Sequence, residues 1–512
     1  MHGTHRTLRR AIPLTIAAAL LVALALLYAR AAGAYRHDPR PARDLAAELN
    51  APWASVPASR RAAPVYERLD DAWRAANPPP ADDPYRDLRA VAPHDPDFAA
   101  LADLVRTLEP ELADARAAAA FETLGADFAR PTPEDLALFD PVPTDPVMLE
   151  SAIFLRIPGI GHASITTALL LIDADHAAVH NDADRFTADV HASLAIARQV
   201  RQIPIFLADI IALRAVEQAA KRIRRALADH PDLLDEPALA ALQADLAETA
   251  RRHTTLRIEH ELLTLSDVLD RTFSPGPQGR LTKVGIRRLD SIYHGNNLIR
   301  EIIPDENAAM APLLAPSLGT RAQNLVWQDD LIAQATAARD AGPAGAAAYI
   351  SVESERLFSE TSDAPVVART LFPALGSALY SQHVVQLEAE ATLVAIALHR
   401  HRLAHGAYPP TLHPLVPALL DALPADPFDP ISNPIKYRLT AAGPTLYYNG
   451  ANRRDDNGTP PVPNPASPYA TDAVRSFNTL APGQTWPNAP AADWVIYPDP
   501  PAHTPTPPDP DR

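Results

Sequence analysis

The sequence predicts a mainly α-helical protein with an N-terminal transmembrane helix, an exported α-helical bundle or hairpin array, and a small α+β module near its C-terminal end. Three observations support this fold class. An uncharged apolar run fills residues 11–29, apolar residues recur at helical spacing beyond residue 148, and short segments after residue 434 alternate like strands. With 512 residues, of which 47% are hydrophobic, the chain can build a substantial core.

The composition excludes several classes of function. The chain carries 46 Lys and Arg against 62 Asp and Glu, a formal net charge of −16, so no basic surface for nucleic acid is expected. It contains no Cys, which removes disulfides, thiolate metal sites and cysteine nucleophiles. The phosphate loops G-x-x-x-x-G-K-[ST] and G-x-G-x-x-G and the hydrolase motif G-x-S-x-G are also missing. We therefore expect neither a nucleotide nor a nucleic acid as partner.

Residues 1–35 are predicted to form a cytoplasmic tip and a transmembrane signal anchor. The run at 11–29 would extend roughly 28 Å as a helix, close to the apolar thickness of a bilayer. Arg6, Arg9 and Arg10 precede it, and positive charge tends to stay on the cytoplasmic side. The prediction is a single-pass inner-membrane protein that contacts the membrane through residues 11–29, with the bulk of its chain extracytoplasmic. A cleaved signal peptide is the alternative, because small residues follow the run.

The next two segments differ in composition. Proline clusters before residue 148, so residues 36–147 are predicted to be a Pro-rich tether with short helices. Residues 148–385 are predicted to form an α-helical domain, in which Asp182 or Asp184 is placed to cap a helix. The spacing of apolar residues predicts helices at 165–180, 186–200, 205–228, 236–269, 322–338 and 364–403.

The C-terminal part, residues 386–497, carries the most specific pattern. Its long helix should end at Gly406, since glycine tolerates a left-handed backbone. The motif Gly406-Ala407-Tyr408-Pro409 follows, and then Leu423-Pro424-Ala425-Asp426-Pro427-Phe428. Alternating residues predict strands at 435–439, 445–448 and 494–497. The Pro-rich residues 498–512 are predicted to be a disordered tail.

This order of a long helix, G-x-Y-P, D-P-F, a Tyr-rich hairpin, an Asn/Asp/Gly loop and a late A-D-W resembles the C-terminal domain of the G-type major pseudopilin of bacterial type II secretion systems. The resemblance covers residues 386–497, about a fifth of the chain, and implies a pseudopilin-like α+β module. The whole chain also looks like membrane-anchored proteins of planctomycete-type bacteria that end in such a module. No Glu follows Gly3 at the spacing of a pilin peptidase site, so a place in a pseudopilus is the weaker expectation.

The resemblance also implies a calcium site. In pseudopilins of this type, a loop near the C-terminus binds calcium through carboxylates, a side-chain oxygen and backbone carbonyls. The matching residues here are Asn452, Asp455, Asp456, Asn457 and Asp493. Calcium takes six to eight oxygen ligands, and these residues supply several of them. A solvated loop of Asx turns is the alternative, since Arg453 and Arg454 lie within it.

Three further clusters of titratable residues are candidate sites. Two histidines one helical turn apart can chelate zinc, and paired carboxylates can act as acid and base. The simpler interpretation of all three clusters is a set of charged, solvent-facing helix ends. The zinc candidates are Asp173, His176 and His180. The histidine cluster is His399, His401, His405 and His413, where Arg400 and Arg402 would repel a cation. The carboxylates are Glu353, Glu355, Glu360, Glu388 and Glu390.

These observations predict a membrane-anchored scaffold or interaction protein of the cell envelope, associated with a secretion apparatus and without catalytic activity. An exported hydrolase with a metal or paired-carboxylate site is one alternative, and a divergent pseudopilin is another. Protein partners in the envelope are expected, and calcium is the cofactor that the sequence suggests. Convergence of Asp173, His176 and His180 in a deep pocket would favour the hydrolase, whereas their exposure at a helix end would favour the scaffold.

Overall fold

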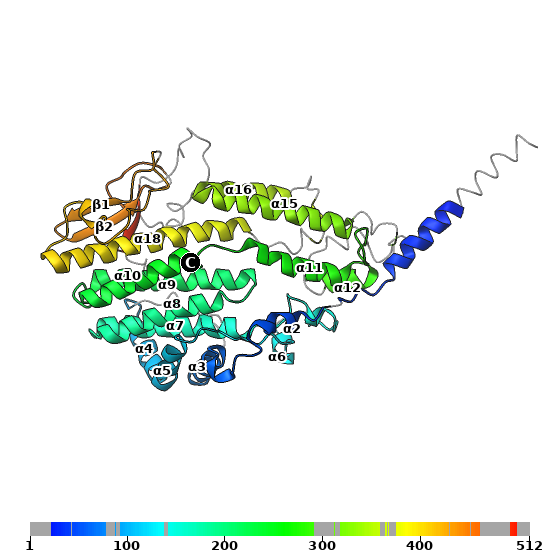
Figure 1. Cartoon of the computed structure of the whole chain (residues 1–512), viewed down its shortest axis with the longest axis horizontal. Helices are drawn as coiled ribbons and strands as arrows, with labels where there is room; N and C mark the ends of the chain where they lie inside the picture. The colour runs from blue at the N-terminus through cyan, green and yellow to red at the C-terminus, as the bar shows by residue number, and fades with distance from the viewer. Residues whose placement is uncertain are drawn as a thin grey trace, which may run out of the picture.

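The computed structural model is a mainly helical protein with one small antiparallel sheet (Figure 1). Most helices run side by side in layers, and the sheet lies against the longest of them. The structure describes residues 22–77, 88, 93–137, 142–290, 312, 318–358, 364–365, 367, 375–460 and 492–498, except for positions 42, 430 and 451.

One element of the predicted fold class is wrong. No helix within the described ranges is both long and apolar enough to cross a membrane, which overturns the predicted transmembrane helix. The described part of that segment, residues 22–35, is helical. Residues 11–21 of the predicted span and residues 499–512 of the predicted tail lie outside the described residues.

Short helices form the first layer. Proline occupies the first turn of three of them, where its missing N–H costs no hydrogen bond. Their apolar residues pack into one core with the next two helices of the chain, and the hydroxyl of Tyr66 donates a hydrogen bond to Gln199 there at 2.7 Å. The helices are α2 (Leu45–Asn50), α3 (Ala63–Ala76), α4 (Phe98–Arg106), α5 (Glu109–Ala118) and α6 (Pro133–Leu136).

Four consecutive helices form the central layer. The carboxylate of Asp182 accepts the backbone N–H of Arg185 at 3.1 Å, and Asp235 accepts that of Ala238 at 2.9 Å, so each caps a helix. Of the two predicted candidates, Asp182 and Asp184, the residue that caps the helix is therefore Asp182. The helices expected near 165–228 are confirmed with shifted ends. These three are α7 (Pro158–Val179), α8 (Ala183–Val200) and α9 (Phe206–Asp229), and α10 (Glu236–His253) completes the layer.

The remaining helices complete the stack. Two of them form a hairpin over a 31-residue helix that contacts α9 and α10 as well. They are α11 (Glu261–Thr272), α12 (Lys283–Asp290), α15 (Arg321–Asp340), α16 (Gly342–Phe358) and the long α18 (Leu375–His405). Because α18 packs against neighbours on several sides, its buried residues lie around most of its circumference. Gly406 ends it with a φ of +77°.

The helix expected over 236–269 is interrupted. The backbone N–H of Leu256 donates to the side-chain oxygen of Gln382 at 2.7 Å. The backbone N–H of Arg257 donates to Asp209 at 2.9 Å. Side chains far away in the sequence thus replace the carbonyl acceptors of a continuing helix, so α10 and α11 are separate.

The sheet has the order β1-β2-β3, formed by β1 (Lys436–Thr440), β2 (Gly443–Tyr448) and β3 (Trp494–Tyr497). Both pairs are antiparallel, with Lys436 opposite Tyr447 and Tyr447 opposite Val495. All three predicted strands are confirmed to within two residues. The inner strand β2 is tied to α18, because the hydroxyl of Tyr448 donates to the carbonyl of Leu387 at 3.3 Å. One apolar core runs from α7 through α18 into this sheet.

Candidate functional site

The predicted zinc candidates on α7 do not converge. Asp173 is fully buried and accepts two hydrogen bonds from the guanidinium of Arg185, at 2.6 and 2.9 Å, and one from Arg116 at 2.5 Å. His180 is exposed at the end of the helix, where its ring stacks on that of His176 at 4.0 Å. The carboxylate of Asp173 therefore binds two arginines, and the rings of His176 and His180 point in another direction.

The arginines around Asp173 hold α5, α7 and α8 together. Arg116 also donates to Asp189 at 2.6 Å and to Glu109 at 2.9 Å. Burial and the neighbouring Asp173 raise the pKa of Asp189. Buried paired carboxylates of this kind can work in catalysis, yet here guanidinium groups bind both oxygens of Asp173 and one oxygen of Asp189, and the other oxygen of Asp189 is buried without a hydrogen bond to a described residue. The arrangement is that of a structural ion-pair network.

The loop expected to bind calcium is closed by hydrogen bonds. Asp493 is buried and accepts the backbone N–H groups of Asp456 at 3.1 Å and Gly458 at 2.7 Å. The amide of Asn452 donates to Asp456 at 2.6 Å, whereas Asp455 accepts the hydroxyl of Tyr447 instead. Burial, together with the nearby aspartates, raises the pKa of Asp493 to about 6.

Hydrogen bonds thus join three of the five predicted calcium ligands, Asn452, Asp456 and Asp493, whereas Asp455 accepts the hydroxyl of Tyr447 and the backbone N–H of Asn457. Among the described residues, no three His, Asp or Glu side chains are placed to hold a metal ion together. The oxygens of Asp493 are already used by N–H donors, and Asn452 and Asp455 each accept the backbone N–H two residues on, which is the pattern of the alternative Asx-turn loop. Calcium at this loop stays a prediction of the resemblance.

The predicted histidine cluster separates into the buried His399, the half-buried His401 and the exposed His405 and His413. His399 is 1% exposed, and its Nε2 lies 2.7 Å from the hydroxyl of Tyr497 and 3.1 Å from that of Tyr408. It therefore joins α18, the G-x-Y-P segment and β3. Burial, and secondarily the charge of Arg402, lowers the pKa of His399 to about 4. The sequence did not predict that His399 contacts Tyr408 and Tyr497, and Tyr497 lies 98 residues away in the chain.

His399→Gln is expected to reduce the acid sensitivity of the fold. The pKa of His399 is about 4 in the folded protein against an ordinary 6.5, so between these values the unfolded chain binds the proton more strongly. His399 should therefore lower the unfolding free energy of the wild type by about 2 kcal/mol as the pH falls from 7 to 5. Urea unfolding at several pH values checks it. His413→Gln, on the exposed turn, is the control, and equal pH slopes for wild type and His399→Gln would contradict the expectation.

The candidate carboxylates do not form an acid–base pair. Glu388 is buried beside Arg224, with 3.4 Å between carboxylate and guanidinium. Glu390 lies two residues further on α18 and faces another direction. Glu353 accepts backbone N–H groups at the start of α18, and Glu360 lies outside the described residues. Each carboxylate in the described part of this set has its own separate surroundings.

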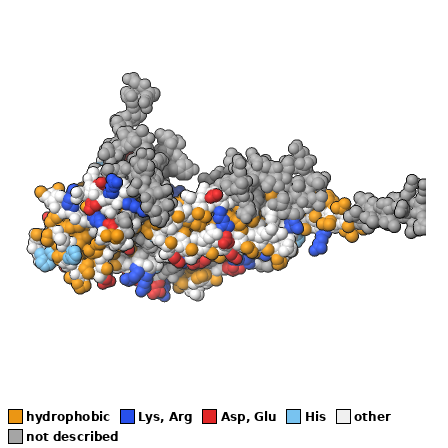
Figure 2. Space-filling view, turned by 90° about the horizontal axis from the view of Figure 1, so that it is seen from above, with side chains coloured by type: hydrophobic (Ala, Val, Ile, Leu, Met, Phe, Trp, Pro, Cys, Tyr) orange, Lys and Arg blue, Asp and Glu red, His pale blue; other side chains and the backbone are white. Residues whose placement is uncertain are grey.

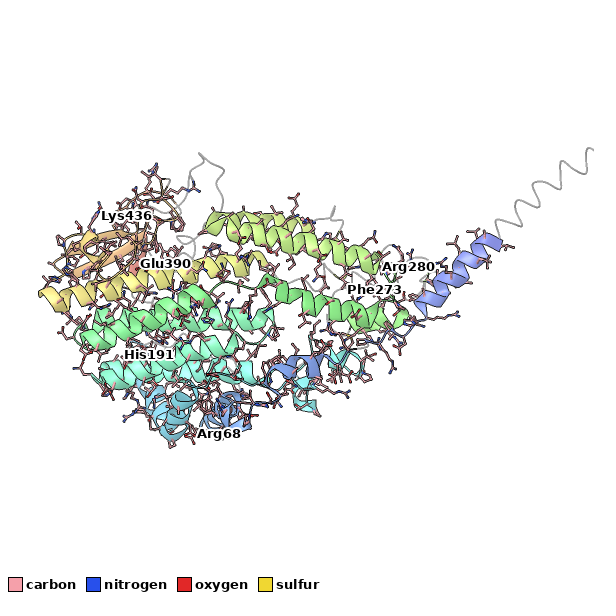
Figure 3. All side chains as sticks on the ribbon, viewed as in Figure 1. Arg68, His191, Phe273, Arg280, Glu390 and Lys436 are labelled. Carbon is pink, nitrogen blue, oxygen red and sulfur yellow. The ribbon has the colours of Figure 1, made fainter. Side chains whose placement is uncertain are left out.

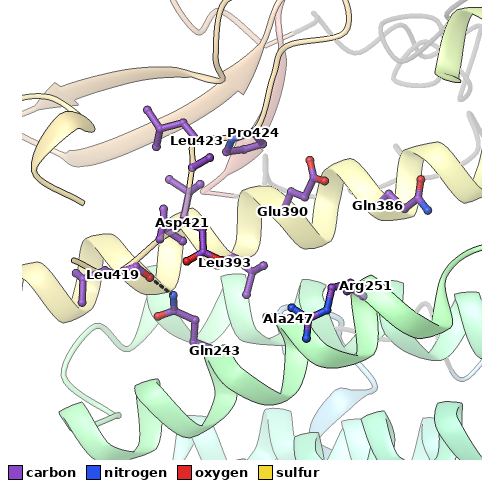
Figure 4. Close-up of a pocket in the computed structure, with 14 residues that line it drawn as sticks. Gln243, Ala247, Arg251, Gln386, Glu390, Leu393, Leu419, Asp421, Leu423 and Pro424 are labelled. Atoms are coloured by element: carbon purple, nitrogen blue, oxygen red, sulfur yellow. Dashed lines mark hydrogen bonds between the residues drawn. The ribbon is translucent and has the colours of Figure 1, made fainter. Parts of the chain in front are cut away.

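An open groove lies between α10, α18 and the segment 419–424, with a volume of about 690 Å³ (Figure 4). Leucines form much of its wall, and the amide of Gln243 closes one side by donating to the carbonyl of Leu419 at 2.6 Å. Glu390 lines it, and Figure 3 places this residue on α18 beside the sheet. No hydrogen bond or ion pair to Glu390 occurs within the described ranges. Glu390 is exposed at the open side of the groove, and the walls beside it desolvate its carboxylate in part and raise its pKa.

No protein-family model, no curated protein and no solved structure matches this chain. The chemistry of the groove and of the ion-pair networks is therefore the basis for assigning a function.

Proposed function

We propose that this protein is a non-catalytic scaffold of the cell envelope that binds a partner protein through the groove between α10, α18 and residues 419–424. The observation that carries the proposal is Glu390, an exposed carboxylate that lines the groove, is partly desolvated by its walls and has no partner among the described residues. A carboxylate beside apolar walls attracts an arriving cation more strongly than one in open water, because binding of the partner excludes water and lowers the local dielectric.

The groove favours a specific kind of partner. Its apolar lining includes Leu393, Leu420 and Leu423, so burial of aliphatic side chains supplies the affinity. Glu390 adds one site for a Lys or Arg side chain. The expected occupant is a protein segment that presents a basic residue between apolar ones. The resemblance of residues 386–497 to a secretion pseudopilin supports a partner from a secretion apparatus.

Other acidic groups in this body support a scaffold over a hydrolase. Asp173 and Asp189 are held by Arg116, Glu388 lies beside Arg224, and each link joins separate helices. Removing one partner of such a pair would leave an uncompensated buried charge. The intact pairs therefore hold the helical layers in register. A rigid body of this kind presents the groove in a fixed shape, which lowers the entropic cost of binding.

Site-specific photocrosslinking in the native cell tests the proposal. A photoreactive residue at Leu420 should give an adduct whose crosslinked peptide contains Lys or Arg among apolar residues. Glu390→Arg should abolish it through charge repulsion, and replacing the partner's basic residue with Glu should restore it. The control position is Arg68, on the opposite side of the body (Figure 3). An adduct that forms equally in Glu390→Arg would refute the proposal.

A further inference from the structure

The last turn of α18 carries two histidines that do not line the groove. His401 and His405 are four residues apart, so they lie one above the other on the same helix face. Their rings stack with centroids 4.1 Å apart and an angle of 19° between planes. His405 is exposed and His401 partly so. Figure 2 shows histidine side chains at the surface of the end of the molecule where α18 finishes.

Hydrogen bonds determine which nitrogen of each ring is available. Nδ1 of His401 lies 3.2 Å from the carbonyl of Ala407, and Nδ1 of His405 lies 3.0 Å from the carbonyl of His401. A carbonyl oxygen only accepts, so each Nδ1 must carry the hydrogen, and the lone pair of the neutral ring resides on Nε2. Such bonds are what orient histidine ligands around metal ions. No described residue is hydrogen-bonded to either Nε2.

The charges around this pair favour a cation. The sequence predicts repulsion from Arg400 and Arg402, but both arginines are already paired. Arg400 donates to Glu236 at 2.6 and 2.9 Å, and Arg402 donates to Asp232 at 2.9 Å. The carbonyl groups at the end of a helix add partial negative charge. The reason for rejecting a metal here is therefore removed by the structure.

We propose that His401 and His405 form a two-ligand surface site for Zn²⁺, bound through the two Nε2 atoms. Imidazole nitrogen is a preferred zinc ligand, and the same pair would accept the chemically similar Ni²⁺ and Cu²⁺. Water, or a donor from a partner, fills the remaining positions. The site is independent of the groove and of the proposed function.

The second stacked pair, His176 and His180, provides an internal comparison. Nδ1 of His180 lies 2.9 Å from the carbonyl of His176, but within the described ranges no hydrogen bond orients the ring of His176. Burial, with the charges of His180 and Arg106, also lowers the pKa of His176. A metal ion there would lie close to Arg106, which forms no ion pair with an acidic residue in the described part of the chain. We therefore expect this pair to bind zinc more weakly.

Competition between the full-length protein and a fluorescent zinc chelator, titrated with ZnCl₂, tests the site. The wild type should hold one Zn²⁺ that the double variant His401→Gln/His405→Gln binds at least about 100-fold more weakly, because the second ligand acts at high effective concentration. His413→Gln and the double variant His176→Gln/His180→Gln should retain it. The variants change exposed or half-buried histidines, and circular dichroism without metal checks their folding.

A second measurement locates the metal. In ¹⁵N-histidine NMR spectra, Zn²⁺ should shift the Nε2 resonances of His401 and His405 while their Nδ1 atoms stay protonated. The proposal is overturned if the wild type holds no Zn²⁺, if His401→Gln/His405→Gln binds it as tightly as the wild type, or if the His176→Gln/His180→Gln pair causes the larger loss.

Discussion

Arg271→Ala is expected to lower the free energy of unfolding by about 3 to 5 kcal/mol, because it leaves a buried carboxylate without a counter-charge. Arg271 is 1% exposed and donates to Asp267 at 2.9 Å through both Nε and Nη2. The same guanidinium donates to the carbonyl groups of Val147 at 2.5 Å and Glu150 at 2.8 Å. One side chain thus ties α11 to a segment more than 100 residues earlier.

Urea unfolding at pH 7 measures the loss. Arg68→Ala is the matched control, since Arg68 is an exposed arginine whose surface ion pair with Asp114 is worth about 0 to 1 kcal/mol. The double variant Asp267→Leu/Arg271→Met should recover much of the stability, because it removes both charges and keeps the volume. A loss for Arg271→Ala no larger than that for Arg68→Ala would contradict the buried ion pair as a support of the fold.

Local patterns in the sequence predicted most of the secondary structure. Asp182 caps α8 and Gly406 ends α18, since a cap depends only on neighbours within one turn. The strands follow from alternation alone. The break before α11 could not be predicted in this way, because the acceptors that cause it, Gln382 and Asp209, come from distant parts of the chain.

The candidate sites were predictable only in part. The resemblance to a pseudopilin grouped Asp493 with the loop around Asp456, and in the structure the carboxylate of Asp493 accepts the backbone N–H of Asp456. It could not show which charges neutralise each other. The charges of Arg400 and Arg402 argued against a cation until their acidic partners were known. Spacing along a helix identifies residues that share a face, whereas the chemistry of that face depends on the helices packed beside it.

Glu353→Gln is expected to remove a pH dependence of stability of about 2 to 3 kcal/mol between pH 5 and pH 8. Glu353 is 4% exposed, and its carboxylate accepts the backbone N–H groups of Leu375 at 2.9 Å and Gly376 at 3.0 Å, at the start of α18. These bonds favour the ionised form, but burial outweighs them and raises the pKa of Glu353 from 4.5 to about 7.

The sign follows from proton binding. Between pH 4.5 and pH 7 the folded protein holds a proton on Glu353 that the unfolded chain releases, so this contribution is complete below pH 4.5 and is lost as pH rises through 7. Unfolding free energies of wild type and Glu353→Gln should therefore diverge with pH, the wild type losing more stability toward pH 8. Glu355→Gln, an exposed position on the same helix, should parallel the wild type. Parallel curves for Glu353→Gln would mean that ionised Glu353 is well accommodated, with the two N–H donors of α18 compensating its burial in full.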